Sequence, residues 1–311
     1  MRDHSDLIEI LPASMLDSHR ILVEQMRHVS SELGIGLGWH YLLDLSWAAH
    51  MLWAGRGDSV MDAGAGVGVM QWWLAAQGIN VLSVDANSRA HLDLRLRAWC
   101  PTDGLRPTDL EPVPRLRWRG LLPPRSPRQW HHWPRKAYAT VRGTATRVPN
   151  PPSDRGTVTT YNQDLAHMPD IPDASLDGVV SISALEHNRP DELRGIVKEL
   201  MRVIKPGGRL VATLGAAKKE DWFHGPSRGW CYTEATLREV FELSDDCPCN
   251  YGLHDELFQA LRDCGELRDN LADFYFRSGN NGMPWGVWDP KYQPVGVIKV
   301  KSVGCLGSCS C

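Results

Sequence analysis

The chain has 311 residues, enough for one large α/β domain with insertions or for two small domains. Apolar residues make up 42% of the sequence, which supports a sizeable core and excludes wholesale disorder. The formal net charge of −3 excludes a global electrostatic attraction to nucleic acid or to anionic membranes.

The sequence contains no evident targeting or membrane segment. Its first residues, MRDHSDLIEILP, carry early charges and a proline and lack the apolar centre of a signal peptide. The best apolar stretch, residues 42–53, is broken by Asp44 and His50, so no membrane span is expected. Eight cysteines in a chain of this length do not make a dense disulfide framework. These features predict a soluble, cytoplasmic protein with reduced thiols.

The first part of the chain reads as helical. Residues 8–33 place apolar side chains at helical spacing, and the glycine-rich stretch 34–38 then interrupts the pattern. A second apolar helix is expected to end near Trp53. We expect residues 1–54 to form an N-terminal helical lid segment.

A β-α-β-α pattern follows. Short apolar strands are predicted at 59–62 and 81–85, and helices at 69–77 and 88–99. This alternation is typical of a parallel, doubly wound sheet.

Residues 100–156 differ in composition. They are dense in proline and arginine, with tryptophans interleaved, and proline at this density removes backbone donors from regular elements. We therefore expect an insertion without regular structure. Its basic and aromatic residues suit a cap over a substrate pocket, an RNA-binding surface, or a grip on an anionic lipid or glycan phosphate.

Regular alternation resumes after the insertion and continues almost to the end of the chain. Strands are expected at 158–161, 177–183, 209–214 and 292–302, and helices at 191–204 and 233–243. Residues 55–303 are thus expected to form the main domain. Residues 304–311 are left as a tail that contains Cys305, Cys309 and Cys311, which could hold a soft metal but lack a nearby fourth ligand for zinc.

The strongest motif is a glycine-rich loop between the first strand and its helix. It reads Asp62-Ala-Gly-Ala-Gly-Val-Gly68, where the chain must turn sharply and let a ligand approach the backbone. Val69 stands where a dinucleotide-binding loop would place its third glycine. Asp85 ends the second strand, about 20 residues further on, where a carboxylate can accept hydrogen bonds from ribose hydroxyls.

These motifs resemble those of class I S-adenosylmethionine-dependent methyltransferases of the small-molecule type. The similarity runs through residues 62–68, Val84-Asp85, residues 163–165, the stretch DGVVSISALEH at 177–187 and residues 205–208, in the family's order. The resemblance implies an α/β fold with a doubly wound, mostly parallel sheet of seven strands. It also implies S-adenosylmethionine as the cofactor. We expect no metal site.

The resemblance also implies which residues bind the cofactor. Asp62 and the glycines would hold its methionine end, Asp85 its ribose, and Asp164 with Leu165 its adenine. Trp39 and Tyr41, before the first strand, resemble the lid segment of small-molecule methyltransferases. The full set of expected cofactor residues is Trp39, Tyr41, Asp62, Ala63, Gly64, Gly66, Gly68, Asp85, Ala86, Asp164, Leu165 and Ser181.

Methyl transfer from a sulfonium is an in-line displacement, so the protein contributes mostly orientation and exclusion of water. A base is needed only when the acceptor arrives protonated. Glu186 and His187 follow the fourth predicted strand at the ligand-binding edge of the sheet and are the catalytic candidates. The alternative for His187 is a histidine that closes the pocket and bonds to the backbone.

Aromatic and histidine side chains cluster near the ends of several predicted elements. The candidates for binding the acceptor are His40, Trp222, His224, Trp230 and Tyr232. Ordinary core packing is the alternative for each of these rings.

Other functions on the same fold remain open at this point. An RNA methyltransferase would use the basic insertion, and a scaffold protein would retain the fold without catalysis. A nicotinamide-dependent oxidoreductase is disfavoured because the third glycine is displaced and no Tyr-x-x-x-Lys pair is present. The sequence favours transfer of a methyl group to a small-molecule oxygen or nitrogen nucleophile and leaves the acceptor and the oligomeric state undefined.

Overall fold

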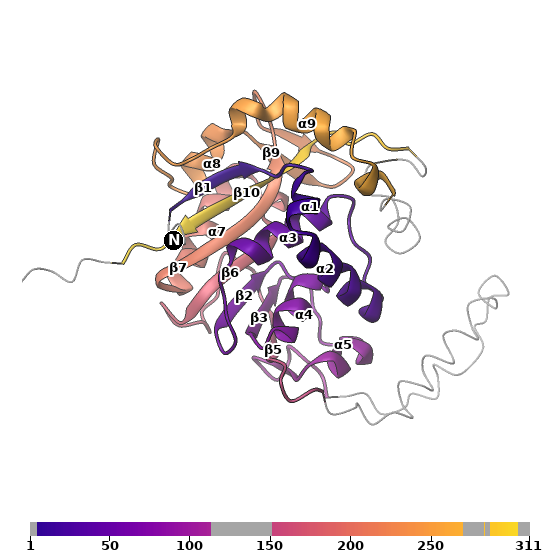
Figure 1. Ribbon diagram of the computed structural model, residues 1–311. Coiled ribbons are helices and arrows are strands. Elements are labelled where there is room, and N and C mark those ends of the chain that lie inside the picture. Colours follow the sequence, from indigo (N-terminus) through magenta and orange to yellow (C-terminus); the bar gives the residue numbers. More distant parts are fainter. Residues whose placement is uncertain (1–4, 113–150, 270–282, 284–286, 304–311) are drawn as a thin grey trace, which may run out of the picture.

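A computed structural model describes residues 5–112, 151–269, 283 and 287–303, and its centre is one β-sheet between layers of helices (Figure 1). Along the sheet the strands follow the order β1-β10-β7-β6-β2-β3-β5-β4, and a β8–β9 hairpin joins the end of β7. The strands are β1 Leu7–Ile10, β2 Ser59–Ala63, β3 Asn80–Asp85, β4 Thr102–Gly104, β5 Val158–Asn162, β6 Leu176–Ile182, β7 Ile204–Ala216, β8 Trp222–His224, β9 Gly229–Tyr232 and β10 Gln293–Val300.

The inner strands of the sheet are parallel. From β7 across β6, β2, β3 and β5 to β4 every pairing is parallel, whereas β10 is antiparallel to β7 and β1 is antiparallel to β10. The chain leaves β2 toward β3 and β5 and later returns to β6 on the other side of β2. Open α/β sheets bind ligands outside the carboxyl ends of the strands at such a reversal. The topology therefore places the binding edge above β2 and β6.

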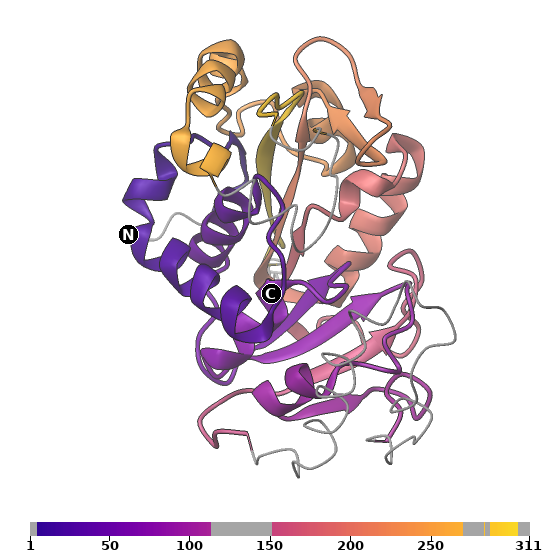
Figure 2. The same ribbon diagram turned by 90° about the vertical axis from the view of Figure 1, so that its right-hand side faces the viewer.

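Helices cover both faces of the sheet, as the view in Figure 2 shows for the indigo N-terminal helices and the salmon α7. The helices are α1 Met15–Ser18, α2 Arg20–Leu33, α3 Tyr41–Met51, α4 Val69–Ala76, α5 Leu94–Trp99, α7 Pro190–Val203, α8 Glu234–Val240 and α9 His254–Arg262, with short 3₁₀ turns at Leu185–His187 and Tyr251–Leu253. Alternate residues of each inner strand pack into two hydrophobic cores, one on each face of the sheet. Val60 and Val180 pack with α2, α3 and α4, whereas Met61 and Val179 pack with α7 and α8. The doubly wound, mostly parallel sheet expected from the sequence is confirmed.

The number of strands and the start of the chain differ from the expectation. The sheet has ten strands among the described residues, not seven, because short strands are added at its edges and after β7. Residues 8–10, expected to be helical, belong instead to β1, which pairs with β10 in the register Leu7↔Ile298. Edge pairing satisfies the backbone groups of this segment, and Pro12 separates it from α1.

The expected insertion is described only at its two ends. Residues 102–104 form β4, parallel to β5, so the expectation that residues 100–156 lack regular elements is wrong at this point. The arginine- and tryptophan-rich stretch 113–150 and the cysteine tail 304–311 lie outside the described residues. The boundaries at 54 and 303 stay a prediction. None of the helices in the described ranges is long and apolar enough to cross a membrane.

One close contact between layers gives a test of the packing. A Cβ added at Gly296 of β10 would lie 2.3–2.6 Å from ring atoms of Trp47 of α3, which is fully buried. We expect Gly296→Ala to lower the free energy of unfolding by about 1–3 kcal/mol because the ring must move. Urea unfolding measures the change.

Gly195→Ala is the matched control. Gly195 is an exposed residue of α7, and an added Cβ there meets no atom within 4 Å. We expect this substitution to stabilise the protein by roughly 0.5–1 kcal/mol, since alanine suits a helix better than glycine. Equal stabilities for the two variants would contradict the packing described here.

Candidate functional site

The glycine-rich loop forms a tight bend between β2 and α4. Gly64 and Gly66 have φ angles of +74° and +48°, a region that side chains with a Cβ rarely adopt. The backbone N–H groups of Gly64 and Ala65 both donate to the carbonyl of Val84, at 2.9 and 3.0 Å. A Cβ on Gly64 would lie 2.4 Å from the Cβ of Ala184, so the bend touches the loop that follows β6. Glycine is required at this position for two independent reasons.

Asp85 fixes the bend from the neighbouring strand. Its Oδ2 accepts the N–H of Gly66 at 2.8 Å, and its Oδ1 accepts the N–H of Asn87 at 2.7 Å. The side chain is largely buried but lines the cleft at the carboxyl edge of the sheet. The carboxylate is thus held at the cleft by its own loop.

Asp62 lies beneath the bend and is 2% exposed. Burial raises the pKa of this carboxyl to about 7, and the nearby Asp85 adds to the rise while Arg89 opposes it. Near neutral pH the group is therefore poised between its neutral and ionised forms. A cation bound beside it would favour the ionised form.

The bend and the two acids border a cleft of about 1110 Å³ at the switch point of the sheet. Residues 33–36, between α2 and α3, form part of its wall. The expected site residues that line it are Tyr41, Asp62, Gly64, Gly66, Gly68, Asp85, Ala86, Asp164, Leu165 and His187.

Three expected cofactor residues do not line this cleft. Trp39 is 1% exposed and packs edge-on against Trp288 and Tyr292. Ala63 and Ser181 face each other inside the sheet, where the Ser181 hydroxyl donates to the Ala63 carbonyl at 2.8 Å. The role of these three residues toward a cofactor stays a prediction.

His187 lies at the surface of the cleft on the 3₁₀ turn after β6. Its Nδ1 is 2.9 Å from the carbonyl oxygen of Arg228. A carbonyl oxygen only accepts hydrogen bonds, so Nδ1 carries the proton in the neutral ring and Nε2 keeps its lone pair. The ring can therefore accept a proton at Nε2.

Glu186 is turned into the interior and is absent from the lining of the cleft. Its Oε1 accepts the hydroxyl of Ser183, while Oε2 is buried without a hydrogen-bond partner among the described residues. Burial raises the pKa of this carboxyl. Ser183 lines the cleft and has a φ of +49°, so a strained residue connects the buried acid to the open space.

The five residues expected to bind the acceptor lie outside the lining of the main cleft. His40 is buried, with its Nδ1 2.5 Å from Asp44 and its Nε2 3.3 Å from the Tyr292 hydroxyl. The Tyr232 hydroxyl donates to the Asn188 carbonyl at 2.5 Å. The other three, Trp222, His224 and Trp230, lie on the β8–β9 hairpin. Their role toward an acceptor stays a prediction.

Several polar residues at the site carried no sequence signal. Gln71 of α4 donates from Nε2 to the carbonyls of Ala65, Gly66 and Gly68, and Arg89 reaches under the same bend. Both are single polar residues in otherwise ordinary segments, and only the folded chain brings them below the loop. In the described part of the chain no cluster of three or more His, Cys, Asp or Glu residues could hold a metal ion.

Comparison with known proteins gives a family for part of the chain. Residues 136–212 match a family model described as a methyltransferase domain, a stretch that includes β5, β6, α7 and most of β7. The glycine bend precedes this stretch. Among the curated proteins none matches the sequence.

Solved structures with a similar fold include three methyltransferases. The 1,6-didemethyltoxoflavin-N1-methyltransferase of Burkholderia thailandensis, with bound 1,6-didemethyltoxoflavin and S-adenosylhomocysteine, is 17% identical over 74% of this chain and 72% of its own, with a TM-score of 0.36. A Methanosarcina mazei S-adenosylmethionine-dependent methyltransferase is 18% identical over 64% and 84%, with a TM-score of 0.39. A putative sarcosine dimethylglycine methyltransferase of Galdieria sulphuraria is 14% identical over 90% and 98%, with a TM-score of 0.38.

At these identities and TM-scores the solved structures say nothing about the acceptor. The match to a methyltransferase domain is limited to residues 136–212, and the doubly wound sheet and the glycine bend with its two carboxylates are the structural features that stand beside it.

Proposed function

We propose that the protein transfers the methyl group of S-adenosylmethionine to an oxygen or nitrogen nucleophile on a small molecule. The observation that carries this proposal is the cleft at the switch point, which the glycine bend, Asp62 and Asp85 border together. Its volume of about 1110 Å³ exceeds what one drug-sized ligand fills and leaves space beside a nucleoside.

The residues of the cleft fit this cofactor. Gly64 and Gly66 line the cleft with backbone at positive φ angles, and Asp85 presents a carboxylate for the ribose hydroxyls. Asp62, whose pKa is raised to about 7, would pair with the ammonium of the methionine part. Asp164 and Leu165 also line the cleft and would contact the adenine. The bound cofactor supplies an electrophilic methyl group on a sulfonium.

The acceptor is expected beside the loop after β6. His187 lines this part of the cleft, and its Nε2 would take the proton that the nucleophile loses. Ser183 and Tyr41 line the same region and would orient the acceptor and exclude water. The chemical step needs little more, because charge is neutralised as the carbon–sulfur bond breaks.

The small-molecule assignment competes with a macromolecular acceptor that would use the insertion. Deletion of residues 113–150 separates these alternatives. Salt-sensitive RNA binding that disappears with the deletion would favour an RNA acceptor. We expect instead that the deletion variant still transfers methyl groups to low-molecular-weight components of a cell extract, with the same or a different choice of acceptor.

Cofactor binding gives the first test. We expect Asp85→Ala to weaken S-adenosylhomocysteine binding by about tenfold or more, because the ribose and the bend lose a charged hydrogen-bond acceptor. Isothermal titration calorimetry measures the dissociation constant. Asp58→Ala is the control, since Asp58 also accepts a backbone N–H, from Gly55 at 2.7 Å, but precedes β2 at the opposite edge. Binding that is unchanged in Asp85→Ala would remove the proposed cofactor site.

Asp62 predicts a pH dependence of the same binding. The folded pKa of about 7 lies above the ordinary value, so the carboxyl is mostly protonated at pH 6 and must lose its proton to pair with a cation. Affinity for S-adenosylhomocysteine should rise about tenfold between pH 6 and pH 8 and then level off. Asp62→Asn should bind weakly with little change over this range. A flat profile for the unaltered protein would argue against this pairing.

His187 predicts an effect on turnover alone. With methyl-labelled S-adenosylmethionine and fractionated metabolites, we expect His187→Gln to slow methyl transfer by about 10²-fold or more while cofactor affinity stays unchanged. His91→Gln is the matched control, because His91 also lines the cleft and is exposed but lies beside the β3 end of the site. Full activity in His187→Gln would show that the acceptor needs no base at this position.

A further inference from the structure

We propose that Arg89 is a positioning residue for the cofactor: it holds the glycine bend from below and balances the two carboxylates that face the cleft. This inference rests on the proposed placement of S-adenosylmethionine in that cleft. Arg89 follows β3 by four residues, is 6% exposed and lines the cleft with part of its side chain.

The guanidinium of Arg89 joins three segments of backbone. Its Nη2 donates to the carbonyls of Ser83 and Tyr161, at 2.7 and 3.0 Å, so it bridges the ends of β3 and β5. Its Nη1 donates to the Ser83 hydroxyl and reaches the Gly66 carbonyl at 3.4 Å. The side chain therefore ties the bend to two strands at once.

Ser83 continues this connection to the other side of the bend. Its hydroxyl donates to Gln71 Oε1 at 2.6 Å, and the amide nitrogen of Gln71 donates to three carbonyls of the bend, at 3.2–3.3 Å. Ser83 is fully buried. The side-chain hydrogen bonds of Arg89, Ser83 and Gln71 described above thus connect the bend with the strands that support it.

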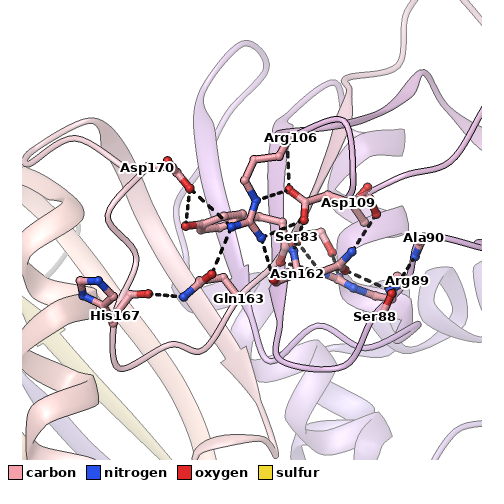
Figure 3. Close-up of polar contacts among 12 residues, drawn as sticks. Ser83, Ser88, Arg89, Ala90, Arg106, Asp109, Asn162, Gln163, His167 and Asp170 are labelled. Atoms are coloured by element: carbon pink, nitrogen blue, oxygen red, sulfur yellow. Dashed lines mark hydrogen bonds and ion pairs between the residues drawn. The ribbon is translucent and has the colours of Figure 1, made fainter.

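A second set of contacts extends from Arg89 to the root of the insertion (Figure 3). The backbone N–H of Arg89 donates to Asn162 Oδ1 at 3.0 Å, and Asn162 Nδ2 donates to the carbonyl of Asp109 at 2.8 Å. Asp109 is 1% exposed and forms an ion pair with Arg106 at 3.0 Å. Arg89 is thus anchored from outside the site as well as within it.

Charge gives Arg89 a second effect on the cofactor site. Burial lowers the pKa of its guanidinium, and the charges of Asp85, Asp62 and Asp109 oppose that shift. Conversely, Arg89 attracts the ionised form of Asp62, which burial and Asp85 disfavour. Loss of the positive charge would raise the pKa of Asp62 further and make pairing with a cationic ligand costlier near neutral pH.

Arg97 offers a control with the same chemistry in another place. It is 7% exposed, and its guanidinium donates to the carbonyls of Leu92, Glu111 and Ala90, at 2.6–3.1 Å. None of these contacts reaches the glycine bend, and Arg97 does not line the cleft. If Arg89 contributed only to stability, replacing either arginine would have the same effect on cofactor binding.

The experiment compares Arg89→Met with Arg97→Met in the full-length protein. S-adenosylhomocysteine binding is measured by calorimetry from pH 6 to pH 8.5. We expect Arg89→Met to raise the dissociation constant by about tenfold or more and to move the midpoint of the pH dependence upward. Arg97→Met should change the dissociation constant by less than about threefold and leave the midpoint in place, even if it lowers thermal stability to a similar degree.

Two further variants separate charge from geometry. Arg89→Lys keeps the positive charge but cannot reach both strand carbonyls, so affinity should fall while the midpoint stays near that of the unaltered protein. If Arg89→Met does not fold, Ser83→Ala decides instead, because it removes only the hydroxyl between Arg89 and Gln71. An unchanged dissociation constant in a folded Arg89→Met, or in Ser83→Ala when that variant decides, would overturn the inference. Absence of binding to the unaltered protein would instead contradict the cofactor site itself.

Discussion

The close approach of the glycine bend to the loop after β6 sets the geometry of the whole site. Gly64 lies so close to Ala184 that it has no space for a Cβ. Two backbone N–H groups of the bend also donate hydrogen bonds to the Val84 carbonyl. Because the bend is held this tightly, α4 begins at a fixed place and its first turn opens toward the cleft. The same contact brings the ends of β2, β3 and β6 together around one space.

Three ionisable side chains set the charge around the glycine bend. Asp62 and Asp85 approach the bend from two strands, and Arg89 opposes them from below. A buried carboxyl whose pKa is about 7 responds to the charge of its ligand, which a fully ionised or fully neutral group would not do. The site is therefore suited to a ligand that carries positive charge, as a sulfonium with an ammonium does.

The aromatic residues around His40 follow a different principle. His40, Tyr292 and Trp39 contact one another at ring distances of 4.6–5.6 Å, and the ring nitrogens of His40 lie within hydrogen-bond distance of Asp44 and of the Tyr292 hydroxyl. Their aromatic area stabilises the join between α3 and β10 more than it exposes a binding surface. The residues that line the cleft directly after β6 are Ser183, Ala184, His187 and Asn188, on a loop whose backbone is strained at Ser183. Strain of this kind is common where a side chain must face a ligand.

The sequence alone determined the doubly wound sheet, the glycine bend and the position of Asp85. Each depends on local pattern: alternation of strands and helices, glycine at positive φ, and an acid at the end of a strand. Only the tertiary structure decided the edge strand at Leu7–Ile10, because edge pairing with a segment almost 300 residues away overrides local preference. It also decided that Arg89 and Gln71 lie under the bend and that Glu186 turns inward while His187 faces the cleft. Single polar residues have no periodic signature, so their roles appear only when distant segments are brought together.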